Sequence, residues 1–334
     1  MVQKRIIWID YAKAFAIAFV VFGHISSRNV WTDWVYSFHM PLFFFLSGLT
    51  LKPQLENIYK PLFRLFKRIM IPYFLYSGLY LLYNILQNVC LHKHLPIFLN
   101  FIGIFLQIRG TNYTVGLWFL PLIFLAEMFI YFVITKKKWI QYMLISIAAL
   151  LGFTYAQTIG RALPWGLDAV PIAAFFIYMG YECKPIKNIE IRSSGHPADF
   201  RTYTYVIVAL FLNFILGRGN VALSGANVDM HKLMYGNPIL FIVAAIFGII
   251  FILLVCQTLP YNIGILSLIG QQTLSIYCMH GLILSFLKKT FEVVVHQNIE
   301  DVCVGLQLVA SIAVIMVCVT ITRLENRLQK RRLK

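Results

Sequence analysis

The sequence predicts an all-α fold, a polytopic membrane helix bundle with about ten transmembrane helices. Of its 334 residues, 60% are hydrophobic, 16% are aromatic and only 13% are charged. A soluble domain could not bury so much apolar surface, whereas a helix of ~20 apolar residues crosses the ~30 Å hydrocarbon layer of a bilayer. Because no internal repeat, low-complexity tract or separate soluble domain interrupts the apolar runs, we expect a single membrane domain over residues 1–334.

The predicted spans are apolar runs, most of which have about the length of one crossing. Two of them, 36–51 and 203–217, are shorter than the others. In chain order the ten spans are 6–25, 36–51, 69–89, 116–134, 139–158, 164–182, 203–217, 238–258, 262–287 and 302–321.

The run from Pro96 to Ile108 decides the number of spans, because it is too short to cross comfortably. With ten spans, loops on the side of the N-terminus carry 20 Lys and Arg residues, and the opposite loops carry 8. If the short run also crossed, the split would become 13 against 15. Loops rich in Lys and Arg stay in the cytoplasm. The asymmetry therefore predicts ten spans with both termini cytoplasmic.

The net charge of +16 does not indicate a nucleic-acid partner. The excess lies in short loops and in the tail, where membrane topology and anionic lipid explain it, and no nucleic-acid module is recognisable. The six cysteines show no CxxC pair, and the histidines show no HxxxH or HxH spacing. We therefore expect the lipid bilayer as a partner, and we expect no metal.

The first span carries three ionisable residues, which is unusual at membrane depth. Asp10, Lys13 and His24 lie within it, and burying each costs several kcal/mol unless it pairs or lines a cavity. At ~100° per residue, Lys13 and His24 point within about 20° of each other, and Asp10 and His24 within about 40°. The helical rise separates Lys13 from His24 by roughly 16 Å. The spacing predicts one polar stripe that runs through the membrane and lines a pore or an active site.

Topology places four polar groups, His24 among them, at similar depth in four different spans. His24 closes the first span, His39 opens the second, Asp168 begins the sixth, and His280 lies near the outer end of the ninth. Any one of the histidines alone could simply belong to the aromatic belt at the interface. Their agreement in depth favours a site in the outer half of the membrane.

Glu127 is predicted near mid-bilayer, where a carboxylate needs a partner, and Lys13 is one candidate. Ser47 and Gly48 either make a small-residue packing contact or present the Ser47 hydroxyl to the pore, with packing favoured for Gly48.

On the cytoplasmic side, Arg64 and Arg68 belong to a basic turn. This turn either grips the phosphates of an anionic ligand or only fixes the topology.

Two classes of function fit these polar spans. One is an enzyme with a buried active site, and the other is a proton-coupled exporter of a sugar or lipid that uses Asp10, Lys13 and Glu127. Transporters tend to show repeated halves and helices broken at matching positions. Neither feature is visible in this sequence.

Five stretches of the chain, in order, resemble the integral-membrane acyltransferase-3 family. Within that family they are most similar to the O-acetyltransferases of bacterial surface polysaccharides, especially the fucose O-acetylase-like branch. The stretches are Arg5 to His24, Phe38 to Gly48 (FHMPLFFFLSG), Arg64 to Tyr73, Leu117 to Leu120 (LWFL) and Gly270 to His280 (GQQTLSIYCMH).

The resemblance implies acetyl-CoA as acyl donor, a carbohydrate hydroxyl as acceptor and a bacterial cytoplasmic (inner) membrane as location. It also implies that Lys13 and His24 are a basic residue and a catalytic histidine that act together. Many relatives carry Arg at the first of these positions, so Lys13 keeps a point charge but loses a bidentate contact. Transfer of another acyl group, such as succinyl, within the same family stays open, as do the sugar and its hydroxyl position.

We hypothesise that CoA enters from the cytoplasm, with its nucleotide near Arg64, Arg68 and the first-span residues Lys13 and Asp10. Its pantetheine arm is about as long as the distance from Lys13 to His24, so the thioester would reach His24, the expected general base. Candidates to orient the His24 imidazole are Asp168, His39 and His280, and candidate oxyanion donors are Ser47, Ser275 and Tyr277. A ping-pong route through an acetylated His, Ser or Cys278 is the alternative to direct transfer.

Overall fold

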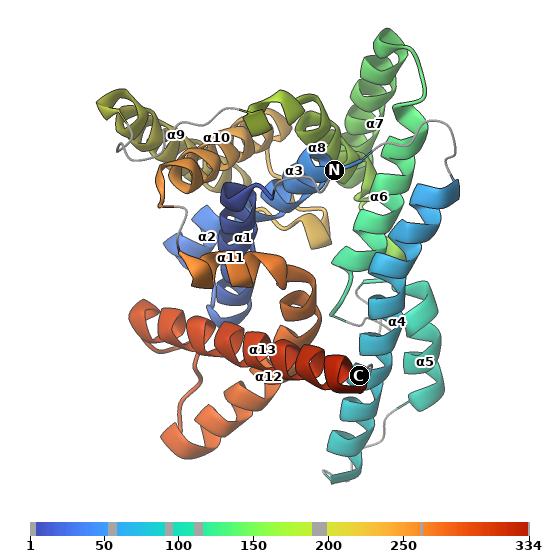
Figure 1. The fold of residues 1–334 in the computed structure, drawn as a ribbon, viewed down its shortest axis with the longest axis vertical. Coiled ribbons are helices and arrows are strands. Elements are labelled where there is room, and N and C mark those ends of the chain that lie inside the picture. The colour runs from blue at the N-terminus through green and yellow to red at the C-terminus, as the bar shows by residue number, and fades with distance from the viewer. Residues whose placement is uncertain are drawn as a thin grey trace. The chain divides into compact units, whose positions relative to one another are not determined.

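The computed structural model describes residues 5–52, 59–90, 96–109, 116–188, 199–260 and 263–332, and these ranges are mostly helical (Figure 1). Within them, the extended pairing is confined to an isolated bridge between Asp229 and Met234. The predicted all-α fold is therefore confirmed. The α-helices are α1 (Ile7–Ile25), α2 (Val30–Tyr36), α3 (His39–Thr50), α4 (Tyr59–Cys90), α5 (Ile97–Leu106), α6 (Phe119–Val133), α7 (Lys138–Thr158), α8 (Val170–Glu182), α9 (Phe200–Ser224), α10 (Pro238–Thr258), α11 (Gly264–Gln271), α12 (Thr273–Val295) and α13 (Val304–Arg332). Three short 3₁₀ helices are η1 (Pro164–Gly166), η2 (Lys184–Asn188) and η3 (Met230–Lys232).

Six helices among the described residues are long and apolar enough to cross a membrane, namely α1, α4, α7, α9, α10 and α13. The other predicted spans contain the helices α3, α6, α8 and α12, which do not meet both criteria of length and apolarity. The run at 96–108 forms the ten-residue helix α5, which is too short for a crossing. Membrane-spanning helices are thus confirmed, while the count of ten and the cytoplasmic termini stay predictions.

One predicted span is divided between two α-helices, and another starts at the last residue of one. The segment 36–51 breaks after Tyr36, and α3 begins at His39. Pro41 then stands in the first turn of α3, where the backbone N–H that proline lacks would have no helical partner. The segment 262–287 breaks at Gln272, which ends α11 and precedes α12.

The chain forms two compact units. Unit 1 comprises Met1–Phe43, Pro185–Asn227 and Ile239–Lys334, and unit 2 comprises Phe44–Lys184 and Val228–Pro238. Helix α3 begins in the first unit and ends in the second. The predicted single domain over 1–334 stays a prediction.

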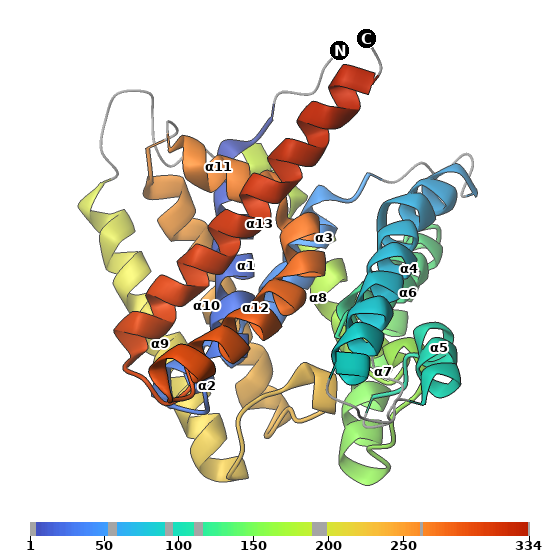
Figure 2. The ribbon, with the colours of Figure 1, turned by 90° about the horizontal axis from the view of Figure 1, so that it is seen from below.

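In unit 1, α1 packs against α2, α11, α12 and α13 (Figure 2). Ala12, Ala16 and Ile17 of α1 are completely buried, and the small alanine side chains let neighbouring helices approach closely. The hydroxyl of Tyr11 donates to the carbonyl oxygen of Pro260 (2.9 Å) and accepts from the backbone N–H of Ile263 (3.0 Å). Tyr11 thereby ties α1 to the segments on either side of the α10–α11 connection.

In unit 2, α6 packs against α4, α7 and α8, and α5 packs against α4. The part of α3 in this unit crosses α8 at Gly48 and Gly180, both of which are buried. A Cβ atom at Gly48 would overlap the main chain at Ile177, and one at Gly180 would overlap the main chain at Phe45. Packing is therefore the role of Gly48, as the sequence favoured.

Candidate functional site

Helix α1 is continuous from Ile7 to Ile25, so Asp10, Lys13 and His24 lie on one unbroken helix. The predicted common face for these residues follows directly from that continuity. Asp10 is buried, Lys13 is half-buried, and His24 is exposed near the C-terminal end of the helix. The stripe thus ends at an imidazole that a ligand can reach.

The rings of His24 and His280 lie against each other in unit 1. Their centroids are 5.2 Å apart and the ring planes are tilted by 38°. His280 comes from α12 and is 3% exposed, whereas His24 is open to its surroundings. His280 is therefore one of the three residues expected to orient His24, and its ring contacts the His24 ring in this unit.

The backbone of α12 fixes the tautomer of His280. Its Nδ1 lies 2.7 Å from the carbonyl oxygen of Tyr277, an atom that can only accept a hydrogen bond. Nδ1 must therefore carry the proton, which leaves the lone pair of a neutral ring on Nε2. The ring of Tyr277 also packs 5.5 Å from that of His280. His280 is held as a buried proton acceptor beside an exposed histidine.

His39 is connected to the same region through Tyr36. The rings of Tyr36 and His39 lie 4.9 Å apart, and the Tyr36 hydroxyl donates to the carbonyl oxygen of Gly23 (3.3 Å). A Cβ atom at position 23 would lie 2.8 Å from the Tyr36 ring, so the residue before His24 has to be small. His39 Nδ1 is 2.9 Å from the carbonyl oxygen of Val35, which fixes its tautomer as in His280.

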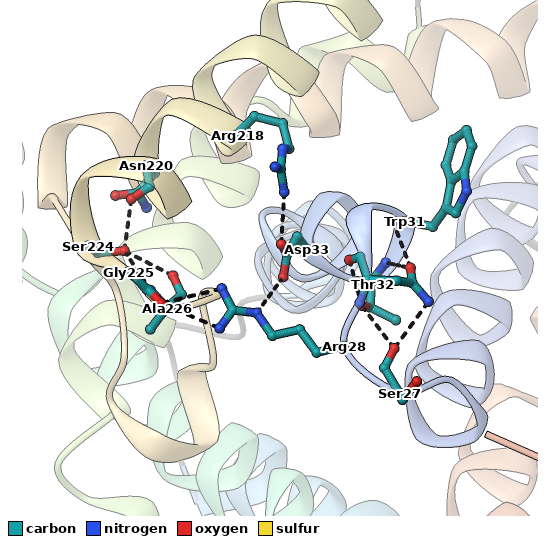
Figure 3. A network of polar contacts seen from close by, with 11 residues as sticks. Ser27, Arg28, Trp31, Thr32, Asp33, Arg218, Asn220, Ser224, Gly225 and Ala226 are labelled. Atoms are coloured by element: carbon teal, nitrogen blue, oxygen red, sulfur yellow. Dashed lines mark hydrogen bonds and ion pairs between the residues drawn. The ribbon is translucent and has the colours of Figure 1, made fainter. Parts of the chain in front are cut away.

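The turn that follows His24 is fixed by the cap of α2 (Figure 3). The Asn29 side chain accepts from the backbone N–H groups of Trp31 (2.9 Å) and Thr32 (3.0 Å). The Thr32 hydroxyl oxygen in turn accepts from the Asn29 N–H at 2.7 Å. This reciprocal capping satisfies backbone donors that a helix start leaves open. The chain direction after His24 is therefore well determined.

Asp33 ties this turn to α9. Its carboxylate is 6% exposed and accepts from Arg28 Nε (3.3 Å) and from Arg218 Nη1 (2.9 Å) (Figure 3). Arg28 also donates to the carbonyl oxygen of Gly225 at 3.4 Å. Two guanidinium groups thus compensate one buried carboxylate. Arg28 lies four residues after His24, and Arg218 lies in the last two turns of α9.

The remaining first-span residues lie near the start of α1. Both carboxylate oxygens of Asp10 accept from Arg5, at 2.6 Å and 3.2 Å. Asp10 therefore bears a compensated charge next to Lys13.

The candidate oxyanion donors on α12 differ in exposure. Ser275 is half-buried and Tyr277 is buried.

In unit 2, the structure gives Glu127 two partners that the sequence did not pair with it. Its carboxylate is 2% exposed and accepts from the Ser47 hydroxyl (2.5 Å) and from Arg68 Nη2 (2.9 and 3.1 Å). The Arg68 side chain is 62% exposed, and Arg64 is exposed one turn earlier on α4. Three helices, α3, α4 and α6, thus meet around one buried charge.

Asp168, also in unit 2, pairs with Arg109. Its side chain is completely buried, and its oxygens accept from Arg109 Nη1 at 2.9 Å and from the backbone N–H of Leu163 at 2.9 Å. The carboxylate therefore orients a guanidinium and the turn before α8. Sequence reasoning had considered Asp168 only as a partner for a histidine.

A pocket beside this pair contains residues that sequence reasoning missed. Arg109, Gln107, Trp118 and His231 line it, and the rings of Trp118 and His231 lie 4.7 Å apart at a tilt of 36°. Burial lowers the pKa of His231, with smaller opposing and supporting effects from neighbouring charges. The only sequence signal was Trp118 in the LWFL stretch, because Arg109 and His231 lie outside the predicted spans.

The described residues contain no group of three or more His, Cys, Asp or Glu side chains arranged to hold a metal ion. The site chemistry available in unit 1 is instead that of two contacting imidazoles, one exposed and one buried. Such a pair suits proton transfer to or from a hydroxyl.

Comparison with known families assigns the chain to one of them. The model of the acyltransferase-3 family, described as an acyltransferase domain, matches residues 6–323. The chain belongs to the acyltransferase-3 family. This membership confirms the family predicted from the five stretches, whereas the fucose O-acetylase-like branch stays a prediction. Neither the comparison with curated proteins nor that with solved structures gave a match.

Membership of the acyltransferase-3 family and the apolar helices together make this protein an integral membrane acyltransferase. The alternative class, a proton-coupled exporter, is not favoured by this family. The predicted roles of the individual residues stay predictions.

Proposed function

We propose that the protein transfers an acetyl group from cytoplasmic acetyl-CoA to a hydroxyl of a sugar in a surface polysaccharide or on a lipid carrier. His24 is the general base in this proposal, and His280 positions it. The observation that carries the proposal is the ring contact between exposed His24 and buried His280. A histidine titrates near neutral pH, which suits a base that must bind and release a proton in each cycle.

The proposed reaction is a direct transfer. The sugar hydroxyl gives its proton to His24 while its oxygen attacks the thioester carbonyl carbon, which forms the C–O bond. The C–S bond then breaks, and the CoA sulfur leaves as a thiolate. The His24 imidazolium gives this thiolate the proton that it took from the sugar hydroxyl. The products are an O-acetyl sugar and CoA with a free thiol, so atoms and charge balance.

His280 supports the charge that His24 gains. Its Nδ1–H is committed to the Tyr277 carbonyl, so its Nε2 lone pair can accept a hydrogen bond from a protonated neighbour. His280 therefore favours the imidazolium form of His24 during the attack, as an orienting partner does for a catalytic base. Tyr277 and Ser275 on the same helix are the proposed oxyanion donors, because Tyr277 already contacts the His280 ring.

The donor is proposed to lie along α1. The continuous helix sets Lys13 about 16 Å from His24, a span that a pantetheine arm covers. Lys13 and the neighbouring Asp10 lie toward the other end of this stripe. Arg64 is exposed and basic, which suits the nucleotide phosphates, whereas the nearby Arg68 guanidinium already pairs with Glu127. The Ser47 hydroxyl, also considered for the oxyanion, donates to Glu127 in unit 2.

The location that fits this reaction is a bacterial cytoplasmic membrane, with both termini in the cytoplasm. Acetyl-CoA is a cytoplasmic donor, and the predicted topology puts His24 toward the outer surface, where glycans are assembled. The apolar helices support the membrane location.

A glycan analysis in cells tests the proposal without knowledge of the acceptor. O-acetyl signals in the NMR spectra of surface polysaccharides are compared between cells with the gene, without it, and complemented with His24→Ala or His296→Asn. His296 is an exposed histidine with left-handed backbone at the end of α12, which Asn tolerates. We expect the signals to need the gene and to be lost with His24→Ala but kept with His296→Asn. O-acetylation in the His24→Ala cells, or succinyl in place of acetyl signals, would contradict the assignment of base or acyl group.

The donor is tested separately on the purified protein. Acetyl-CoA should raise the Tm in detergent, because a ligand that binds only the folded state stabilises it, and Lys13→Ala should weaken this effect. Incubation with labelled acetyl-CoA in the absence of acceptor should leave no label on the protein. Label trapped on a His, a Ser or Cys278 would favour the ping-pong route over direct transfer.

A further inference from the structure

The end of α1, just after His24, is tied to other helices of unit 1 by the hydroxyl of Ser26. Helix α1 ends at Ile25, and Ser26 is its C-cap with extended backbone (φ −87°, ψ 135°). The Ser26 N–H donates to the carbonyl oxygen of Phe22 at 2.9 Å. The last carbonyl groups of a helix lack partners within it, and helix ends fray. His24 stands in this last turn, so contacts from outside the helix decide how well its imidazole is held.

The Ser26 hydroxyl has a partner on each side. It donates to Gln307 Oε1 at 2.6 Å and accepts from Asn29 Nδ2 at 2.8 Å. Asn29 caps α2, and Gln307 lies in the first turn of α13. One hydroxyl therefore joins the end of α1 to the beginnings of two other helices.

The Gln307 carboxamide is held in one orientation. Gln307 is 2% exposed, and its Nε2 donates to the carbonyl oxygens of Glu300 (2.9 Å) and Val302 (3.1 Å), with that of Ile299 at 3.5 Å. Carbonyl oxygens only accept, so the amide nitrogen must face them and Oε1 must face Ser26. Because Oε1 also only accepts, the hydroxyl hydrogen of Ser26 points at Gln307. A buried amide whose donors and acceptor are all used resists displacement.

The carbonyl groups that Gln307 binds belong to the connection from α12 to α13. The Ser27 hydroxyl donates to the carbonyl oxygen of Glu300 at 3.2 Å, and Lys288 of α12 donates to the Glu300 carboxylate at 2.5 Å. Lys288 follows His280 by about two turns of α12. The end of α1 is thus linked, through this connection, to the helix that carries one of the two contacting histidines.

Burial makes the bond between Ser26 and Gln307 the main tie in this link. The side chains of Lys288 and Glu300 are 34% and 44% exposed, so water screens their ion pair. The bond from the Ser27 hydroxyl is exposed as well. The Gln307 amide is shielded from water, where a hydrogen bond is stronger and its loss leaves a buried polar group unsatisfied.

We propose that Ser26, held by Gln307, is a positioning residue for the transfer reaction, because it fixes the last turn of α1 so that the His24 ring stays against His280. This proposal rests on the proposed function, in which His24 is the general base. The two rings are 5.2 Å apart, and a displacement of about 1 Å at a reacting group can slow a reaction about a hundredfold. A side chain that takes no part in the chemistry can thus control its rate.

Ser26→Ala removes the link to α1 and leaves the bonds of Gln307 to the connection in place, whereas truncating Gln307 would leave several carbonyl groups without a donor. Ser311→Ala is the matched control, because the buried Ser311 hydroxyl donates to the backbone carbonyl oxygen of Gln307 at 2.7 Å, within α13. Each change removes one hydroxyl that bonds Gln307, so each should lower the Tm by about 1–2 °C. Ser26→Thr restores the hydroxyl at an extended backbone position, which suits a β-branched residue.

The rate is measured in inverted membrane vesicles from cells that make the surface polysaccharide, with labelled acetyl-CoA as donor and the glycan of those membranes as acceptor. Label incorporated into the glycan gives the maximum rate and the acetyl-CoA concentration at half that rate. Ser26→Ala should lower the maximum rate about tenfold and keep the half-saturating concentration within about twofold, because no proposed donor contact is changed. Ser311→Ala and Ser26→Thr should keep both values near those of wild type.

The position of the His24 ring is measured without any acyl transfer, by NMR of the purified full-length protein with isotope-labelled histidine in detergent. The His24 signals are the ones lost in His24→Ala. The ring current of His280 displaces them, and His280→Asn removes that displacement. Ser26→Ala should move the His24 signals toward their positions in His280→Asn, because the two rings separate. Ser26→Thr and Ser311→Ala should leave them at their wild-type positions.

The two measurements separate this proposal from the proposed function. If the wild type transfers no acetyl group but Ser26→Ala moves the His24 signals, the proposed function fails and the fixation of His24 by Ser26 stands. Unmoved His24 signals in Ser26→Ala overturn the proposal, and so does a wild-type rate of this variant where the wild type is active. Equal losses in Ser311→Ala, or no rescue by Ser26→Thr, overturn it as well, because the hydroxyl bond between Ser26 and Gln307 is then not the cause.

Discussion

The close crossing of α3 and α8 makes Gly48→Ala a sharp test of the packing in unit 2. A Cβ atom at this position would lie 2.7 Å from the carbonyl carbon of Ile177 and 2.9 Å from the backbone nitrogen of Tyr181. The Cβ atom would come closest to the carbonyl oxygen of Ile177, which it would overlap. Ordinary van der Waals contact begins at 3.4 Å, so the two main chains would have to part by more than the 0.7 Å that the carbonyl carbon alone requires. None of these atoms can rotate away, because all belong to the backbone of a helix.

The cost of this change can be worked out roughly. Overpacking costs about 1–3 kcal/mol when side chains can adjust, and a rigid backbone puts Gly48→Ala at the upper end. The higher helix propensity of alanine returns about 1 kcal/mol. A net loss of about 2 kcal/mol corresponds to a Tm lowered by roughly 3 °C for a chain of this size. Gly180→Ala should behave alike, since its Cβ would lie 2.8 Å from the carbonyl carbon of Phe45.

The assay is thermal unfolding in one detergent, with gel filtration to confirm a monodisperse sample. Gly78→Ala on α4 is the matched control, because no atom lies within 4 Å of its added Cβ. Its Tm should equal that of wild type or exceed it. The double variant Gly48→Ala/Gly180→Ala should lose less than the sum of the two single losses, since one separation of the helices relieves both clashes. Equal Tm values for Gly48→Ala and Gly78→Ala would refute the reasoning.

Three further changes test the charged sites. Glu127→Gln should lower the Tm by about 1–2 °C in thermal unfolding, because the loss is only about 1 kcal/mol when the Arg68 partner is 62% exposed to screening. The pKa of His231 is lowered in the folded state, so the unfolded state takes up more protons as the pH falls through about 6.5, and stability drops. Between pH 7.5 and 5.5 the Tm of wild type should therefore fall more than that of His231→Asn, and parallel curves would contradict this. Asp33→Asn should leave Arg28 and Arg218 without their shared carboxylate and slow acyl transfer several-fold in a rate assay, and an unchanged rate would exclude a role for this anchor in positioning His24.

The sequence predicted the helices better than the contacts between them. Apolar runs revealed the all-α fold, and agreement in depth placed His24 and His280 in one group, which the ring contact now joins. The break at Gln272 was not predicted. Hydropathy measures how apolar a run is, and it does not show where helical hydrogen bonding stops within that run.

The ion-pair partners of the buried carboxylates were the least predictable part of the structure. Glu127 needed a cation, but periodicity within one helix cannot say which of several basic helices will lie beside it, and Arg68 does. Arg109 and Asp168 are 59 positions apart, so only the folded chain brings them together. The pocket around them was missed because its residues come from short connecting segments, where no periodic pattern exists.

The arrangement around Glu127 also bears on how the protein is made. Ser47 and Arg68 both precede Glu127 in the chain, and ribosomes deliver the N-terminal parts first. When the carboxylate enters the bilayer, the hydroxyl and the guanidinium that receive it have already been synthesised. A permuted gene that places residues 59–90 after 119–133 would insert the acid before its cation, and quality-control proteases should then remove much of the nascent product.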